Sequence, residues 1–272
     1  MAKKAEPIGV FDSGIGGLTV LKALQEKYPN ESYVYIGDTA RLPYGTKSPE
    51  TVIRYAQGLT KEILRHQVKA IVVACNTAST HALGAVQDMA KNGAKNGAKD
   101  IPVLGMLEPA SRAGIAATKN NHIAVMATYG TVKSGAYETA IQSIDPSVQV
   151  SSRACQLLVA LAEEGWANDK IAKDVLRKYL EPIFDRQNRP DTLILGCTHF
   201  PLFEKEIGEI LGPEVTLINS GKAAAEELNI SSDGQTGTCR FFATDDPARF
   251  AVNAAKFFGR EISAADVELI DI

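Results

Sequence analysis

Short apolar runs alternate with longer stretches of helical spacing along most of this 272-residue chain. The runs are typical of buried strands in parallel sheets, and the stretches between them are typical of amphipathic helices. Such alternation predicts βαβ units with right-handed crossovers. Strands are expected at 7–11, 32–37, 68–74, 101–105, 122–127, 148–152, 193–196, 215–219, 239–243 and 267–272, and helices at 18–27, 49–66, 77–90, 110–118, 134–144, 157–184, 223–228 and 247–259.

Two of the expected strands run directly into a cysteine. Residues 70–77 read AIVVACNT and residues 192–199 read TLILGCTH. Asn and Thr favour helix N-caps, so Cys75 and Cys197 are each expected where a strand ends and a helix begins. Ligands of open α/β sheets bind at that edge, and a helix N-terminus favours the thiolate form of a cysteine.

A glycine-rich turn, DSGIGG at 12–17, follows the first strand. It is not a dinucleotide fingerprint, because Thr19 occupies the third glycine position, and it is not a P-loop, because no Gly-Lys-Ser/Thr follows. The carboxylate of Asp12 would repel a phosphate, so the turn suits an amino acid with an ammonium group. The alternative is that Asp12 or Ser13 only caps the next helix.

The two cysteines leave different chemistries open. A thiol nucleophile needs one cysteine and an activating histidine, which Cys197 and His199 would supply while leaving Cys75 without a task. Two opposed thiols suit the inversion of a stereocentre, in which one thiolate removes a proton and the other thiol returns one. The protein would then hold the substrate itself and exclude water. A non-catalytic amino-acid-binding protein is a third alternative. The polar candidates for holding substrate are Asp12, Ser13, Asn76, Thr77 and Thr198.

Composition narrows the class of protein. The length suits two domains, and 45% hydrophobic with 22% charged residues is an ordinary globular balance. A net charge of −3 without a basic block argues against direct nucleic-acid binding. The apolar runs are too short to span a membrane, and the first residues do not form a signal peptide. No cofactor-binding motif is found, and the tandem NGAK repeat within 91–100 is expected to be a surface loop or helix extension.

The four cysteines form no C-x-x-C pair and no metal-type spacing with histidine. This usage predicts a cytosolic protein with reduced thiols, no disulfide framework and no metal site. Cys155 and Cys239 are interpreted as small buried hydrophobic residues.

Five motifs together resemble the bacterial glutamate racemases, within the cofactor-independent aspartate/glutamate racemase superfamily. They are Asp12-Ser13-Gly14-Ile15-Gly16-Gly17, Gly37-Asp38, Pro43-Tyr44-Gly45, Cys75-Asn76-Thr77 and Gly196-Cys197-Thr198-His199. They occur in the family's order and span almost the whole chain. The resemblance implies an enzyme that interconverts L- and D-glutamate without cofactor or metal, supplies D-glutamate for peptidoglycan, and forms a homodimer.

The resemblance also implies an α/β fold of two similar domains, each a mainly parallel sheet flanked by helices, with the active site in the cleft between them. The first domain would comprise 1–99 and 213–272 and carry Asp12, Tyr44 and Cys75. The second would comprise 100–212 and carry Glu163, Cys197 and His199.

Roles in the site follow from the resemblance in the same way. Cys75 and Cys197 would be the opposed acid–base pair, with Asp12 readying the first and His199 assisting the second. A glutamate assists His199 in the family, and Glu163 is the expected match, with Glu164 as the alternative, because Gln156, Ala160 and Ala162 depart from the family pattern here.

The implied substrate contacts are Asp12, Ser13, Tyr44, Gly45, Asn76, Thr77, Thr198 and His199. Related aspartate racemases tend to carry a glutamate at the position of His199. His199 and the DSGIGG turn therefore favour glutamate as substrate, with another small acid as the alternative.

Overall fold

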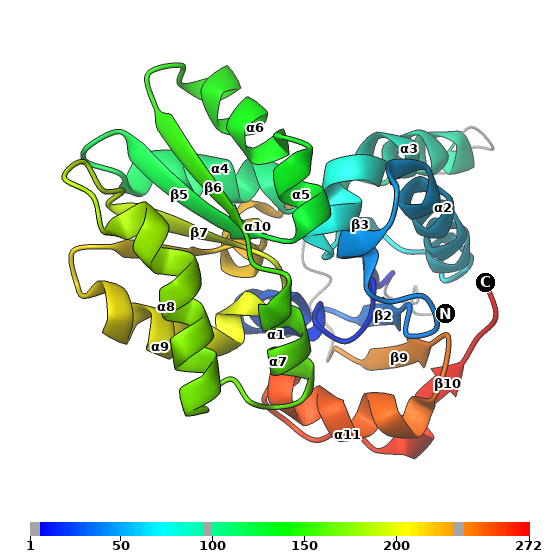
Figure 1. Cartoon of the computed structure of the whole chain (residues 1–272). Coiled ribbons are helices and arrows are strands. Elements are labelled where there is room, and N and C mark those ends of the chain that lie inside the picture. The colour runs from blue at the N-terminus through cyan, green and yellow to red at the C-terminus, as the bar shows by residue number, and fades with distance from the viewer. Residues whose placement is uncertain (1–5, 95–99, 231–236) are drawn as a thin grey trace.

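The computed structural model describes residues 6–94, 100–230 and 237–272, which form two parallel sheets (Figure 1). The six-stranded sheet has the order β10-β9-β2-β1-β3-β4, and the four-stranded sheet has the order β6-β5-β7-β8. The first sheet contains β1 (Ile8–Asp12), β2 (Tyr33–Gly37), β3 (Ala70–Val73), β4 (Val103–Leu104), β9 (Cys239–Ala243) and β10 (Val267–Leu269). The second contains β5 (His122–Ala127), β6 (Gln149–Ala154), β7 (Thr192–Gly196) and β8 (Thr216–Asn219). The predicted fold class is confirmed.

The helices connect these strands and cover both faces of each sheet (Figure 1). They are α1 (Leu18–Lys27), α2 (Pro49–Arg65), α3 (Asn76–Ala94), α4 (Leu107–Ala117), α5 (Tyr129–Lys133), α6 (Ala136–Ile144), α7 (Leu157–Glu163), α8 (Lys170–Phe184), α9 (Glu204–Leu211), α10 (Ser220–Glu227) and α11 (Pro247–Phe258). Three short 3₁₀ helices are η1 (Tyr44–Thr46), η2 (Phe200–Phe203) and η3 (Ala264–Asp266).

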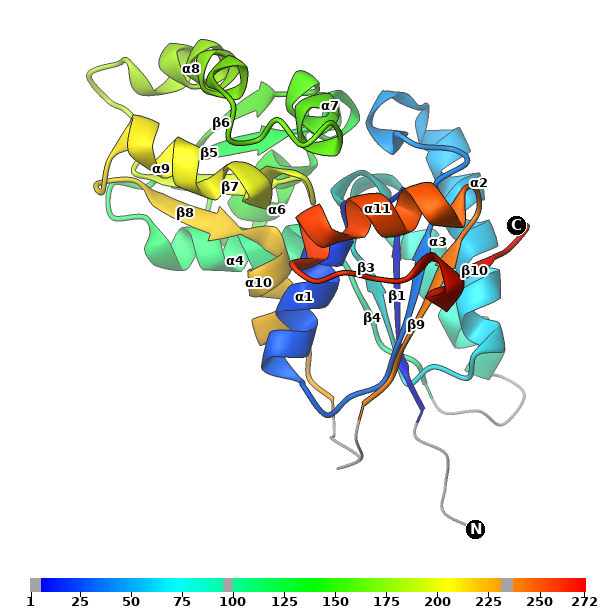
Figure 2. The ribbon, with the colours of Figure 1, turned by 90° about the horizontal axis from the view of Figure 1, so that it is seen from below.

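Alternating side chains of the first sheet face two helical layers. Val10 and Val72 pack in one cluster with α1 and α11, whereas Phe11 and Val73 pack in a second cluster with α2 and α3. The period of two along each strand explains why consecutive apolar residues are all buried. The first cluster continues into the second sheet, and α1 and α10 lie side by side between the sheets (Figure 2). The two domains therefore share apolar packing.

The sheets do not divide at the expected domain boundaries. β4 lies after residue 100 but pairs with β3 in the first sheet, and β8 lies after residue 212 but pairs with β7 in the second. Each domain thus takes one strand from beyond the boundary expected for it.

The structure differs from the expected elements in three places. The helical region expected at 157–184 is broken into α7 and α8, because Gly165 adopts a left-handed φ of 80° and Asp169 caps a new helix. α9 was not predicted, and the expected turn at 128–131 begins α5. The repeat segment is helical to residue 94, while 95–99 lie outside the described residues. Within the described ranges no helix is long and apolar enough to cross a membrane.

Candidate active site

The residues predicted to carry chemistry lie at the carboxyl ends of strands. Asp12 ends β1, Cys75 follows β3 just before α3, and Cys197 follows β7. β1 and β3 are parallel neighbours, so Asp12 and Cys75 share one edge of the first sheet. Both thiols are almost fully buried, with 5% of Cys75 and 6% of Cys197 exposed.

The turn after β1 contacts the turn after β7 across the domain boundary. A Cβ atom on Gly16 would lie 2.4 Å from Oγ1 of Thr198 and 2.5 Å from Cε1 of His199. The hydroxyl of Thr19 donates a hydrogen bond to the carbonyl of Thr198, at 2.8 Å. Only glycine allows the backbone of the first turn to approach His199 so closely. The two cysteine-bearing edges therefore face one another.

On the first-domain side, a buried carboxylate lies beside a buried thiol. The backbone N–H of Gly14 donates to Oδ2 of Asp12, at 3.0 Å. Burial raises the pKa of Asp12, although the charge of His199 and backbone hydrogen bonds act in the opposite direction. Sγ of Cys75 accepts a hydrogen bond from the N–H of Ala78, at 3.4 Å, at the start of α3.

Burial and then the negative charge of Asp12 raise the pKa of Cys75 to about 12, against the lowering effect of hydrogen bonds from Ala78 and Ser13. The charge of Cys197 also raises this pKa, so the two thiols interact electrostatically. At neutral pH the Cys75 thiol is protonated and suited to donate a proton.

On the second-domain side, His199 links a thiol to a carboxylate. Its Nδ1 lies 3.8 Å from Sγ of Cys197, and its Nε2 lies 3.2 Å from Oε1 of Glu163. Burial alone would lower the pKa of His199, but the hydrogen bonds and charges of Cys197 and Glu163 raise it to about 10. The imidazolium form is therefore favoured and donates to both partners. Glu163 makes this contact, whereas Glu164 is exposed. The rings of His199 and Phe257 pack in a T-shaped arrangement, with 5.2 Å between centroids.

Three of the predicted substrate-binding residues contact the second domain. Gly45 lies against Thr128, where an added Cβ would be 2.6 Å from the threonine Cβ. Oγ1 of Thr77 lies 2.9 Å from Oγ1 of Thr128. Nδ2 of Asn76 donates a hydrogen bond to Oγ of Ser220, and Oδ1 of Asn76 accepts one from the Tyr137 hydroxyl.

Tyr44 is the exception among these residues, because its hydroxyl points away from them. It donates to Oδ2 of Asp38, which also accepts from the Arg41 guanidinium at 2.8 Å. Burial and the Asp38 charge raise the pKa of Tyr44 above its usual range, so this hydroxyl stays a donor. The Tyr44 hydroxyl is therefore held by Asp38 within the first domain.

Sequence reasoning missed several residues of this region. Thr128 and Ser220 directly follow β5 and β8, so the strand-end rule that located the cysteines would have found them. Asp38, which belongs to one of the five motifs but was assigned no role, follows β2 in the same way and is fully buried. Tyr137 and Phe257 lie within helices and carry no comparable signal.

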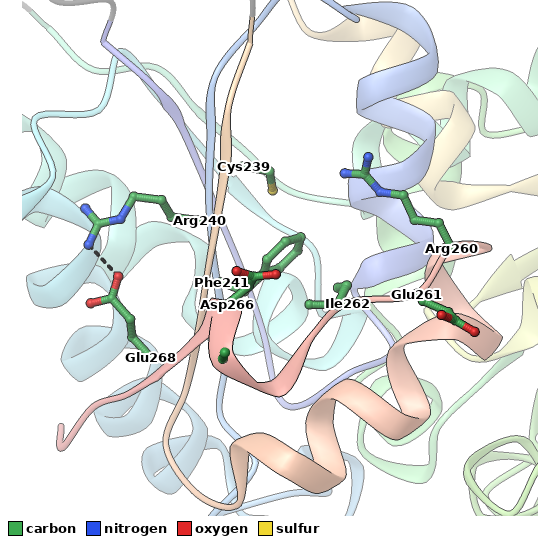
Figure 3. A pocket seen from close by; sticks show the side chains of 9 residues that line it. Cys239, Arg240, Phe241, Arg260, Glu261, Ile262, Asp266 and Glu268 are labelled. Atoms are coloured by element: carbon green, nitrogen blue, oxygen red, sulfur yellow. Dashed lines mark hydrogen bonds and ion pairs between the residues drawn. The ribbon is translucent and has the colours of Figure 1, made fainter.

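Two pockets differ in their relation to this site. One of about 270 Å³ adjoins Glu163 and is lined by residues of both domains, namely Ile15, Thr39, Leu42, Glu163, Asp245, Asp246, Arg249, Phe250 and Asn253. Another of about 450 Å³ opens beside β9 and η3 (Figure 3), and neither Cys75 nor Cys197 lines it. Cys239 lies at its wall and is half-buried, whereas Cys155 is fully buried as predicted. No group of three or more His, Cys, Asp or Glu residues in the described ranges is arranged to hold a metal ion.

Comparisons with known proteins show the family and the fold of this chain. The sequence profile of the Asp/Glu/Hydantoin racemases matches residues 8–228. A glutamate racemase from Geobacter metallireducens is 43% identical over 264 residues, which cover 94% of this chain and 93% of that protein. Glutamate racemase isoform RacE1 from Bacillus anthracis has a TM-score of 0.89 and 37% identity, over 99% of both chains. The Francisella tularensis glutamate racemase, in complex with D-glutamate, has a TM-score of 0.85 and 36% identity, over 98% of this chain and 97% of that one.

The two-sheet fold and its match to the racemase family define an isomerase of the amino-acid racemase class. The match covers most of the chain, and the resemblance drawn from the five motifs is confirmed. The chain belongs to the Asp/Glu/Hydantoin racemase family.

Proposed function

We propose that this protein is a glutamate racemase, which interconverts L- and D-glutamate by proton transfer at Cα between Cys75 and Cys197. The observation that carries the proposal is the contact of Gly16 with Thr198 and His199, which places the turn after β1, the strand next to the one that leads to Cys75, against the turn that carries Cys197. Curated relatives that are 38–43% identical over nearly their full length are glutamate racemases. Structures of relatives from Francisella tularensis and Escherichia coli are complexes with D-glutamate and L-glutamate.

The proposed reaction moves one proton in each of two steps. A thiolate on one face of the substrate takes the Cα proton, so that a C–H bond breaks and an S–H bond forms. The thiol on the other face then protonates the planar carbanion, and its own S–H bond breaks. His199, held by Glu163, supplies positive charge beside Cys197. Cys75, with a pKa of about 12, supplies the proton donor in that direction. The roles exchange when the reaction runs backward.

Substrate binding is assigned to the polar atoms around the two thiols. Asp12 is the carboxylate proposed to meet the ammonium group. Ser13, Asn76, Thr77 and Thr198 are proposed to hold the carboxylates, together with the backbone of Tyr44 and Gly45. Fixed donors in a buried site stabilise developing charge better than water does. We propose that no cofactor or metal takes part.

The wider role is proposed from the same family membership. D-glutamate made by this enzyme would enter peptidoglycan. The enzyme would act in the cytosol, where its four free thiols stay reduced.

The enzyme would form a homodimer and have no direct nucleic-acid partner. Light scattering of the purified protein tests the dimer, and a monomeric mass at micromolar concentration would contradict it.

Deuterium incorporation tests the reaction itself. Purified enzyme with L-glutamate in deuterated water should yield D-glutamate carrying one deuterium at Cα, measured by chiral chromatography and mass spectrometry. Adding pyridoxal phosphate or a chelator should leave the rate unchanged. L-aspartate and L-alanine, run in parallel, should turn over far more slowly. Absence of D-glutamate at high enzyme concentration would refute the proposal.

A further inference from the structure

Tyr137 connects the two domains within the site, although no motif points to it. It lies on α6 of the second domain and is 1% exposed. Its hydroxyl donates a hydrogen bond to Oδ1 of Asn76, at 2.7 Å. Asn76 begins α3 in the first domain and directly follows Cys75.

A second hydrogen bond fixes the orientation of the same amide. Nδ2 of Asn76 donates to Oγ of Ser220, at 3.4 Å, and Ser220 in turn donates to the carbonyl of Leu195, at 3.0 Å. Ser220 begins α10, and Leu195 lies on β7, two residues before Cys197. The amide therefore has one donor, from α6, and one acceptor, from α10. Because Ser220 gives its single hydroxyl proton to Leu195, it accepts from Nδ2, and exchange of the amide oxygen and nitrogen would leave Oδ1 facing Ser220 without a donor.

The ring of Tyr137 also contacts the strand that carries the other thiol. A Cβ on Gly196 would lie 2.9 Å from Cε2 of Tyr137. One side chain therefore touches the residue after Cys75 and the residue before Cys197. Burial, and then the charge of Cys197, raise the pKa of Tyr137 above its usual range. The phenol stays protonated at neutral pH, so it is a permanent donor and does not exchange protons with the thiols.

We propose that Tyr137 is a positioning residue of the racemase, which holds the Cys75 turn and the Cys197 turn at the spacing that proton transfer at one carbon requires. Its ring supports Gly196, and its hydroxyl orients the Asn76 amide toward the substrate. The inference rests on the proposed function, because it assigns a part in that same reaction. Reacting groups lose rate steeply when their relative placement changes by even 1 Å.

The test replaces Tyr137 with phenylalanine, which removes only the hydroxyl. Tyr137→Phe is expected to lower kcat/KM for glutamate by about tenfold or more in both directions, as for a lost buried hydrogen bond that orders a site. Tyr33→Phe is the matched control, because Tyr33 is equally buried and donates to the carbonyls of Leu24 and Tyr28, at 3.0 and 2.9 Å, in the first-domain core. That variant should stay within about twofold of wild type.

A double-mutant cycle with Asn76→Ala separates positioning from a general packing effect. If Tyr137 acts through Asn76, the double variant loses less than the product of the two single losses. Wild-type kinetics for Tyr137→Phe, or independent losses in the cycle, would overturn the inference. If Tyr137→Phe does not fold by circular dichroism, Ser220→Ala replaces it in the same cycle, with the same expected coupling to Asn76.

A readout without substrate keeps this inference apart from the proposed function. Loosening the Asn76 contact should expose Cys75, so alkylation of Cys75 by iodoacetamide, followed by mass spectrometry, should be several-fold faster in Tyr137→Phe. Tyr33→Phe should match wild type. Faster alkylation in an enzyme that makes no D-glutamate would refute the function and keep the positioning role. Racemisation with unchanged alkylation and kinetics in Tyr137→Phe would refute the positioning role alone.

Discussion

Glu163 accepts a hydrogen bond from His199, with 3.2 Å between Oε1 of the carboxylate and Nε2 of the imidazole. The opposite nitrogen of the same ring faces Sγ of Cys197, at 3.8 Å. The carboxylate thus fixes both the charge and the orientation of the ring that neighbours the second thiol. Glu163 is the last residue of α7 and Glu164 its exposed neighbour, so a matched pair of variants can isolate this contact.

Removing this carboxylate should shift the alkaline limb of the pH–rate profile. The contacts with Cys197 and Glu163 raise the pKa of His199 to about 10, so an amide at position 163 should lower it. His199 would then lose its proton at a lower pH, and activity would decline from that lower pH upward. For Glu163→Gln we expect a shift of about one pH unit or more. Profiles of kcat/KM in both directions measure it.

Glu164→Gln is the control for that experiment. Its side chain is exposed and makes no contact with His199, so its profile should overlay that of wild type. Identical profiles for Glu163→Gln and wild type would contradict the role assigned to Glu163. A shift in Glu164→Gln alone would show that the neighbouring carboxylate acts instead.

The two-thiol mechanism requires both cysteines. Cys75→Ala and Cys197→Ala should each lower kcat by about 10²–10⁴-fold or more, the scale of general acid–base catalysis. Chiral chromatography of the glutamate product measures the loss. Cys155→Ala makes the same chemical change at a fully buried thiol that donates a hydrogen bond to the carbonyl of Arg153. It should cost about 1 kcal/mol of stability and leave kcat near wild type. Full activity in either site variant would eliminate the mechanism.

Glycine at position 16 is required by the contact between the two turns. An added Cβ would lie 2.4 Å from Oγ1 of Thr198 and 2.5 Å from Cε1 of His199, so the imidazole would have to move. Gly16→Ala should lower kcat/KM by about tenfold or more and destabilise the fold by about 1–3 kcal/mol. Steady-state kinetics and thermal unfolding measure the two effects.

Gly14→Ala is its control within the same turn. A Cβ there would meet Cδ2 of Leu42 at 3.4 Å, an ordinary contact, and the backbone N–H that Asp12 accepts would be kept. Its kinetics should stay within a few-fold of wild type. Equal losses in Gly14→Ala and Gly16→Ala would show that the turn is sensitive to any side chain, rather than to contact with His199.

The sequence predicts the part of this site that depends on strand ends. Apolar runs place the strands, and capping residue types mark where each strand gives way to a helix, so Asp12, Cys75 and Cys197 could be assigned to sheet edges. α1 and β5 have the bounds that the pattern predicts. α9 was missed because it is an eight-residue helix rich in charge that directly follows η2.

Contacts between distant segments could not be predicted in this way. Tyr137 meets Asn76 across 61 residues, and Thr19 meets Thr198 across 179. Such pairs depend on how the two domains pack, which no local periodicity encodes. The choice between Glu163 and Glu164 also needed coordinates, because adjacent residues on a helix end differ only in direction.

The charge of Asp12 should control the pKa of the Cys75 thiol. Its negative charge, after burial, helps raise the pKa of Cys75 to about 12, because a like charge disfavours the thiolate. Asp12→Asn removes the charge and keeps an acceptor for the N–H of Gly14, so the pKa of Cys75 should fall. Alkylation of Cys75, followed by mass spectrometry over a pH series, should then accelerate at a lower pH than in wild type.

Asp38→Asn is the control for the effect of Asp12 on the pKa of Cys75, because that equally buried carboxylate pairs with Arg41. Turnover should nevertheless fall by about 10²-fold in Asp12→Asn, since the carboxylate proposed for the substrate ammonium is lost. An unchanged or higher pH midpoint for alkylation would contradict the electrostatic coupling of Asp12 to Cys75.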